Sequence, residues 1–259
     1  APSVRSNAGV KFVHTVETQK LLKYIAIGGN LLADKNFKHC SMTCIAAYGA
    51  SLVYNGVYAP TITPFIPNKG GYYKPKSEND MSYAFLLQYG TFRYFTGGDL
   101  GGSNQGNYSD GETPVATYLH GAYGVNFHVC ALKVSHHGSA HSTNAVFVGV
   151  LKPSFAVFPA ALRTYGRSQF PLPTINAITA LKNSKMYFTF IPNHQDVFPD
   201  SYCLKGNLNF LQDISLLVYG IPGAGNNLPF YIRTIARNLQ DYSYHGNAVT
   251  TPVSCTQNH

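Results

Sequence analysis

Short apolar runs alternate with helical patterns along the middle of this chain, and that alternation predicts a layered α/β fold. The first clear unit is a β-hairpin, because the aromatic-rich runs Tyr83 to Tyr89 and Phe92 to Thr96 are separated by the turn residues Gly90-Thr91. Further elements are expected after it: a helix over 110–123, a strand over 129–134, a helix over 143–151, a strand over 154–158, a helix over 174–183, a strand over 185–191 and a closing hairpin over 214–219 and 230–232.

The two ends of the chain carry weaker patterns. Residues 1–80 are predicted to form an N-terminal segment and connector, with a helix-like stretch from Val16 to Ile27, a strand-like run from Met42 to Ala47 and a proline- and glycine-rich loop from Tyr58 to Lys76. Residues 81–235 contain the α/β core. Residues 236–259 have few apolar side chains, so we expect a tail that runs over the surface.

Composition excludes two classes of protein. Apolar residues make up 45% of the chain, including 16 Phe and 19 Tyr, which is enough surface to bury and excludes a disordered chain. The longest apolar runs are far shorter than the ~20 residues of a membrane-spanning helix. Charged residues are only 12%, and a surface made polar by Tyr, Asn, Ser, Thr and Gly instead favours a secreted protein. The start at Ala1 shows no signal peptide and is typical of a processed or truncated N-terminus.

Cysteine usage is compatible with secretion. Five cysteines are an odd number, so at most two internal disulfides can form. Cys130 lies inside an apolar run and is predicted to be a buried free thiol. Cys203 with Cys255, and Cys40 with Cys44, are the candidate pairs in an oxidising compartment.

One glycosylation sequon is present, Asn107-Tyr108-Ser109, and it lies in a stretch rich in Gly, Asn and Ser. We expect this stretch to be a surface loop. Asn107 is therefore the candidate glycosylation site of a secreted chain.

The first cluster of candidate chemistry is Thr96-Gly97-Gly98-Asp99-Leu100-Gly101-Gly102, at the end of a predicted strand. Glycines on both sides allow backbone turns that a Cβ would resist, so Asp99 can project into a cleft. A carboxylate can bridge two cations about 3.5–4 Å apart, which is the geometry of two-metal hydrolysis. The alternative is an ordinary aspartate in a glycine-rich turn.

The second cluster is Ser135-His136-His137-Gly138-Ser139, after the predicted strand over 129–134. Neutral imidazole is a common zinc ligand. Adjacent histidines on an extended chain point to opposite faces, so one of His136 and His137 can bind metal while the other packs, hydrogen-bonds to a neighbour or meets a substrate oxygen. Ser139 and His141 on the following turn are candidate substrate contacts, or else ordinary loop residues.

Together these clusters resemble the metallo-β-lactamase superfamily, in particular its ComEC-like branch, whose members include the extracellular domain of competence DNA-uptake proteins and related secreted hydrolases. The resemblance extends over roughly residues 40 to 220, and a His-His-Gly-Ser turn about 35 residues after a Gly-Asp turn is its most specific feature. The segments that carry it are Glu78 to Ser82, Tyr89 to Leu100, Asp110 to Thr113, Leu132 to Ser139 and Leu151 to Pro153.

The resemblance implies an αββα sandwich, incomplete at its N-terminal side, with 81–235 as the C-terminal half-domain and a metal site at one edge of the sheets. It implies that Asp99 is the bridging carboxylate and that His136 or His137 is a ligand of the second metal. One or two zinc ions would activate a water and neutralise charge on a phosphoryl or acyl oxygen. Asp99, His136 and His137 would then be the catalytic residues.

The sequence also departs from this family. The principal ligand motif, His-x-His-x-Asp-His, is missing, and none of the ten histidines forms a His-x-His pair. We therefore expect either that an upstream half or another chain supplies the missing ligands, or that the fold has been kept and the ligands lost. Tyr165 to Gln169 stands where relatives tend to place Gly-His-Pro, which leaves a third ligand there without support.

Two main functions fit these observations. The first is a metal-dependent hydrolase, or half of one, acting on a phosphodiester such as nucleic acid, because the net charge of +8 favours polyanions. The second is a non-catalytic secreted binding or structural protein. A homo-oligomer is one form of it, because 19 Tyr suit an interface-rich surface. A third hypothesis is an esterase that does not act on nucleic acid, such as one acting on phosphocholine esters.

The basic residues do not form a stripe along the sequence. Arg93, Lys133, Lys152, Arg163 and Arg167 are scattered and are interpreted as solvated surface charges.

Overall fold

The structure is a computed structural model. It describes residues 5–7, 10–12, 27–32, 39–54, 56, 61–159, 172–189, 210–218, 229–238, 244–253 and 255. The predicted helix over Val16 to Ile27 lies outside these ranges except for its last residue, as do Cys203 and the segment Tyr165 to Gln169.

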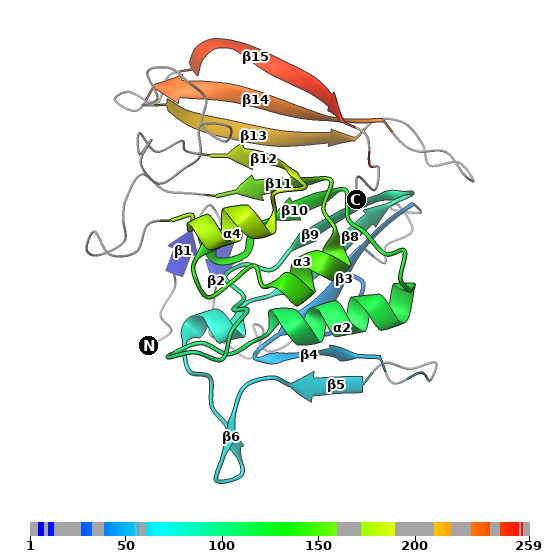
Figure 1. The fold of residues 1–259 in the computed structure, drawn as a ribbon, viewed down its shortest axis with the longest axis vertical. Coiled ribbons are helices and arrows are strands. Elements are labelled where there is room, and N and C mark those ends of the chain that lie inside the picture. The colour runs from blue at the N-terminus through cyan, green and yellow to red at the C-terminus, as the bar shows by residue number, and fades with distance from the viewer. Residues whose placement is uncertain are drawn as a thin grey trace.

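A mixed sheet of eight strands forms the centre of the molecule (Figure 1). Its order is β12-β11-β10-β9-β8-β3-β4-β5, and the four strands from β9 to β12 are parallel, while the remaining neighbours are antiparallel. The strands are β3 (Cys40–Ala47), β4 (Ala50–Val53), β5 (Thr61–Pro64), β8 (Ala84–Tyr89), β9 (Phe92–Thr96), β10 (Ala131–Lys133), β11 (Phe155–Phe158) and β12 (Lys185–Phe188). The predicted hairpin is confirmed as β8 and β9.

Three helices connect the parallel strands in sequence: α2 (Glu112–Tyr123), α3 (Ala145–Leu151) and α4 (Ile175–Ala180). Side-chain caps begin the two shorter ones, because Asn144 accepts a hydrogen bond from the backbone N–H of Phe147 and Thr174 accepts one from Ala177. Helices between parallel strands confirm the predicted α/β class. Two short 3-10 helices, η2 (Glu78–Met81) and η3 (Ser135–Gly138), lie in the loops.

Side chains alternate between the two faces of the parallel strands. On β11, Phe155 and Val157 face one hydrophobic cluster, whereas Ala156 and Phe158 face the other. The cluster that contains Ala156 and Phe158 also contains side chains from all three helices. The helices α2, α3 and α4 therefore pack on the same face of the sheet (Figure 1). Because both faces of these strands are buried, their sequences are continuous apolar runs and do not alternate between apolar and polar residues.

A second, three-stranded antiparallel sheet covers the opposite face. It consists of β13 (Phe210–Val218), β14 (Phe230–Asn238) and β15 (Tyr244–Val253). Phe230 and Ile232 of β14 are buried against Phe92 and Phe155 of the large sheet. Residues 236–259, expected to be a surface tail, thus contain a ten-residue strand. The described residues form helix, sheet and sheet layers, and the fourth layer of an αββα sandwich is not among them.

A disulfide joins the last described residue to the large sheet. Cys130, which immediately precedes β10, is bonded to Cys255, and Cys40 and Cys44 are free thiols. The prediction of a free Cys130 is therefore wrong, and so are both predicted pairings. Cys40 and Cys44 lie on the same strand, β3, where four residues span about 13 Å, far beyond the reach of a disulfide.

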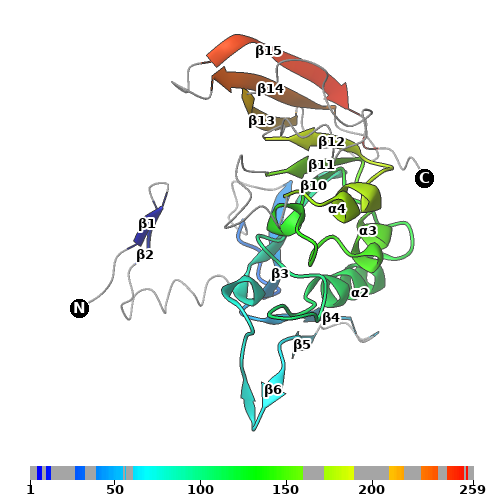
Figure 2. The same cartoon turned by 60° about the vertical axis from the view of Figure 1, so that its left-hand side comes forward.

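Two small hairpins lie outside the main layers. β1 (Arg5–Asn7) and β2 (Val10–Phe12) pair with each other and stand apart from the sheets (Figure 2). β6 (Asn68–Lys69) and β7 (Tyr72–Tyr73) form a projecting hairpin within the loop predicted over 58–76. No helix in the described ranges has the length and apolar character needed to cross a membrane.

Candidate functional site

The candidate site lies where two neighbouring parallel strands end. β9 and β10 pair in register, with Thr96 opposite Lys133, so the turns that follow them leave the sheet at the same edge. The turn after β9 carries Asp99 and the turn after β10 carries His137. Oδ1 of Asp99 lies 3.7 Å from Nε2 of His137. The predicted meeting of this carboxylate with the His-His turn is therefore confirmed.

The turn that presents Asp99 is held by its backbone. Gly98 has a φ of +58°, which glycine adopts without steric cost, and a Cβ there would lie 3.2 Å from the hydroxyl oxygen of Ser82. The backbone N–H of Asp99 donates to Oγ of Ser82 at 3.1 Å. The N–H of His136 donates to the carbonyl oxygen of Gly98 at 3.1 Å, which ties the two turns together.

The two histidines do not continue strand β10. They lie in η3, where both adopt left-handed backbone conformations, with φ of 46° at His136 and 56° at His137. The extended backbone on which the sequence argument for these two residues was based is therefore not present. Their ring centroids are 6.4 Å apart, and each ring has its own set of partners.

His137 is oriented as a metal-ligating histidine would be. Its Nδ1 lies 2.6 Å from the carbonyl oxygen of Pro159, in the loop after β11. A carbonyl oxygen only accepts, so Nδ1 carries the proton and donates it. In the neutral ring Nε2 then holds a lone pair on the side of Asp99. Proteins fix the tautomer of ligand histidines through this kind of hydrogen bond.

Both ring nitrogens of His136 already have partners in the protein. The side-chain amide nitrogen of Asn79 lies 3.3 Å from Nε2, and because an amide NH₂ only donates, Nε2 accepts. Nδ1 then donates to Oγ of Ser139 at 3.1 Å. Burial lowers the pKa of His136, and the nearby carboxylate of Asp99 opposes that effect only in part. Of the two histidines, His137 is thus the one whose nitrogen is open to a ligand.

The two predicted substrate contacts surround His136. Ser139 is 7% exposed, and its hydroxyl also accepts from the backbone N–H of His141 at 3.3 Å. The fixed hydroxyl orients His136 through its hydrogen bond with Nδ1. The ring of His141 stacks on that of Tyr108, with centroids 4.3 Å apart. Asn107, the predicted glycosylation site, is exposed beside Tyr108. Substrate contact by Ser139 and His141 and glycosylation of Asn107 stay predictions.

A buried carboxylate positions the residues that support the two turns. Asp80 is 1% exposed and accepts hydrogen bonds from the backbone N–H groups of Lys76 at 2.7 Å and Ser109 at 2.9 Å, and from the Ser109 hydroxyl at 3.0 Å. It lies in η2, next to Asn79 and two residues before Ser82. Asp80 therefore fastens the loop over 100–109 to the segment whose side chains hold His136 and Asp99.

A second buried carboxylate, Glu112 at the start of α2, binds the backbone just before α3. Its two oxygens accept from the backbone N–H groups of Thr143 and Asn144, each at 2.8 Å, just before α3. Burial raises the pKa of Glu112 to about 8, although these two hydrogen bonds lower it. Its carboxylate also packs directly on the Cα of Gly102. Glu112 thereby joins two helix starts to the loop that follows Asp99.

Lys133, the last residue of β10, is a site residue that the sequence interpretation missed. Its Nζ donates to the carbonyl oxygen of Gly98 at 2.6 Å and lies 3.9 Å from Oδ1 of Asp99. Burial lowers the pKa of Lys133, and Asp99 opposes that shift. Its interpretation as a solvated surface charge is wrong. Its position at the end of a buried strand, directly before the His-His turn, is the signal that could have identified it.

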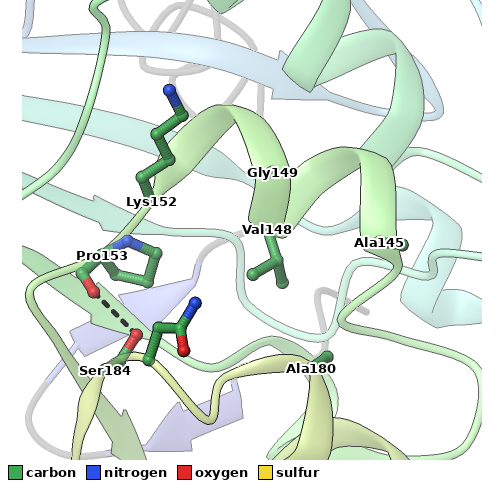
Figure 3. Close-up of a pocket in the computed structure, with 8 residues that line it drawn as sticks. Ala145, Val148, Gly149, Lys152, Pro153, Ala180 and Ser184 are labelled. Carbon is green, nitrogen blue, oxygen red and sulfur yellow. Dashed lines mark hydrogen bonds between the residues drawn. The ribbon is translucent and has the colours of Figure 1, made fainter. Parts of the chain in front are cut away.

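A hollow of about 350 Å³ lies elsewhere, between α3 and α4. Figure 3 shows the residues that line it. Its lining contains no carboxylate or imidazole, and its one charged residue, Lys152, extends away from the other labelled residues (Figure 3). The lining residues are Ala145, Val148, Gly149, Lys152, Pro153, Ala180, Asn183 and Ser184. The groups able to do chemistry are therefore gathered at Asp99 and not in this hollow.

The donor set at Asp99 and His137, one carboxylate and one imidazole, is of the kind that binds zinc. Within the described ranges, however, no three His, Cys, Asp or Glu side chains are placed to hold one ion together. Asp99 and His137 are thus two side chains of zinc-binding type, whereas a catalytic zinc centre has three protein ligands. No protein-family model and no curated protein matches this sequence.

Proposed function

We propose that this protein is a metal-dependent hydrolase with a metallo-β-lactamase-like sandwich, or the C-terminal half of one, and that it acts on phosphodiesters. Asp99 and His137 are two protein ligands of a zinc ion. The observation that carries the proposal is the hydrogen bond from Nδ1 of His137 to Pro159, because it leaves the Nε2 lone pair beside the Asp99 carboxylate. The third ligand comes from residues outside the described ranges or from another chain.

The residues around these two ligands suit phosphoryl chemistry. A bound zinc ion would supply a nucleophilic water at neutral pH and neutralise charge on a phosphoryl oxygen. Asn79 and Ser139 keep His136 neutral and fixed in the wall of the site. The overall charge of +8 attracts polyanions such as nucleic acid.

Secretion is part of the proposal. The Cys130–Cys255 disulfide supports an oxidising compartment, since such bonds persist mainly outside the cytosol. The low content of charged side chains and the exposed sequon residue Asn107 are compatible with it.

A non-catalytic binding or assembly protein is the second candidate. It is favoured by one observation, the placement of the Lys133 ammonium 3.9 Å from Asp99, where a positive charge already balances the carboxylate. On this alternative the fold has been kept while the metal has been lost.

Metal content and activity of purified protein test the choice. We expect wild-type protein to retain zinc after desalting and to hydrolyse bis-(p-nitrophenyl) phosphate and single-stranded DNA. Asp99→Asn and His137→Gln should lose the zinc and lower kcat/KM by more than about 100-fold, since even outer-shell partners of a metal are worth 10–100-fold. His120→Gln, on the exposed surface of α2, is the matched control and should change neither.

The contrary result is equally specific. A folded wild-type protein that binds no zinc after incubation with it, and that shows no hydrolysis above the level of Asp99→Asn, overturns the hydrolase. Elution as a large metal-free oligomer in size-exclusion chromatography would then support the assembly protein.

A further inference from the structure

Two side chains, one neutral imidazole and one ammonium group, lie close to the same atom, Oδ1 of Asp99. The first partner is His137 and the second is Lys133. The Lys133 side chain is 22% exposed, whereas that of Asp99 is 38% exposed, so the lysine is the more covered of the two charged groups. The site therefore contains a cation supplied by the chain itself.

The ammonium group is fixed rather than free to swing away. Nζ donates to the carbonyl oxygen of Gly98 at 2.6 Å, and Gly98 is held in turn by the N–H of His136. Lys133 also belongs to β10, in register between β9 and β11. Its charge is thereby placed between a backbone carbonyl and a carboxylate, which are the oxygen ligands that hard divalent cations prefer.

We propose that Lys133 is a built-in cation that takes the place of a divalent ion on the Gly98 side of Asp99, so that the site holds at most one metal ion. This inference rests on the proposed function in treating Asp99 as a metal ligand. It deepens that function, because a carboxylate that bridges two ions needs a second cation at about 3.5–4 Å from the first. The Lys133 ammonium repels a dication there and leaves only the His137 side open.

The same geometry predicts that Lys133 lowers the affinity of the site for divalent ions. Removing the charge while keeping the shape frees one carbonyl and one carboxylate oxygen for an incoming ion and ends the repulsion. Lys133→Met should therefore bind divalent ions at least about tenfold more tightly than wild-type protein, or bind one ion more. Lys133→Arg keeps the charge and should bind as wild-type protein does.

Titration of the full chain with Mn²⁺, with the free ion measured by electron paramagnetic resonance, tests this inference. Mn²⁺ is the probe because it accepts oxygen ligands. Lys182→Met, at an exposed lysine just after α4, is the matched control and should leave the affinity within about twofold of wild type. Asp99→Asn added to Lys133→Met should abolish the gain, which a general change in stability would not do.

Two results would overturn the inference: an affinity in Lys133→Met that is unchanged or weaker, or two ions bound by wild-type protein. Lys133→Gln repeats the test if the methionine variant does not fold, as judged by circular dichroism. Failure of the proposed function is separate. If wild-type protein binds no ion but Lys133→Met gains one through Asp99, the hydrolase is refuted while the role of Lys133 is supported.

Discussion

At the scale of single residues, hydrogen-bond partners distinguish two histidines that are adjacent in the chain. His137 keeps Nε2 open because its other nitrogen donates to Pro159, whereas His136 uses both nitrogens inside the protein. His136 is therefore a neutral, half-buried supporting residue, and its partial burial makes the folded state sensitive to acid.

The sign of this effect follows from the lowered pKa of His136. Because the unfolded chain, with a histidine pKa of about 6.5, takes up the proton more readily than the folded protein, the stabilisation from neutral His136 is complete above that value. It is lost as the pH falls through the lower pKa of the folded state. We expect the Tm of wild-type protein to drop as the pH falls below about 6.5, and that of His136→Gln to drop less.

Thermal unfolding followed by circular dichroism at several pH values measures this. His120→Gln, which removes an exposed histidine, should keep the wild-type slope. An equal slope in His136→Gln would show that other groups carry the acid sensitivity.

At the scale of elements, the site depends on loops held by buried carboxylates. Asp80 binds the loop over 100–109, and Glu112 joins the starts of α2 and α3. Gly102 lies between these elements, where a Cβ would collide with the Glu112 carboxylate. The close approach explains why a glycine is needed at this point of the glycine-rich loop.

Gly102→Ala should therefore destabilise the protein by about 1–3 kcal/mol, the usual cost of overpacking a tight contact. Gly149→Ala is its control: Gly149 lies in α3 with open space around its Cα, so alanine should be neutral or stabilise by up to about 1 kcal/mol. Urea unfolding of both variants gives the two free energies. A Gly102→Ala protein as stable as Gly149→Ala would contradict the packing described for Glu112.

At the scale of the whole molecule, the Cys130–Cys255 disulfide connects the chain just after β15 of the three-stranded sheet to the start of β10, an interior strand of the large sheet. The two cysteines are 125 positions apart, so the bond closes a long loop that contains α3, α4 and the six strands β10 to β15. Loops of this length lose much conformational entropy in the unfolded chain when they are closed.

Cys255→Ala should cost about 2–5 kcal/mol of unfolding free energy. Cys40→Ala, at a half-buried free thiol, should cost less than about 1 kcal/mol. Urea unfolding measures both, and peptide mapping without reduction should recover Cys130 linked to Cys255. A map that shows Cys130 as a free thiol would contradict this connection.

Local patterns predicted the α/β class, the β8–β9 hairpin and the three helices between parallel strands, because apolar periodicity and turn residues act over a few positions. They also placed Asp99 and the His-His turn at strand ends. Since the ends of neighbouring parallel strands share one edge of a sheet, that placement was enough to predict their meeting.

The tertiary structure alone decided the finer points. Which histidine has an open nitrogen depends on Pro159, in the loop after β11, and on Asn79, in η2. The role of Lys133 depends on strand register. The pairing of Cys130 with Cys255 depends on β15, a strand in the region that the composition predicted to be a surface tail. Each of these is a contact between segments distant in sequence, and local periodicity carries no information about such contacts.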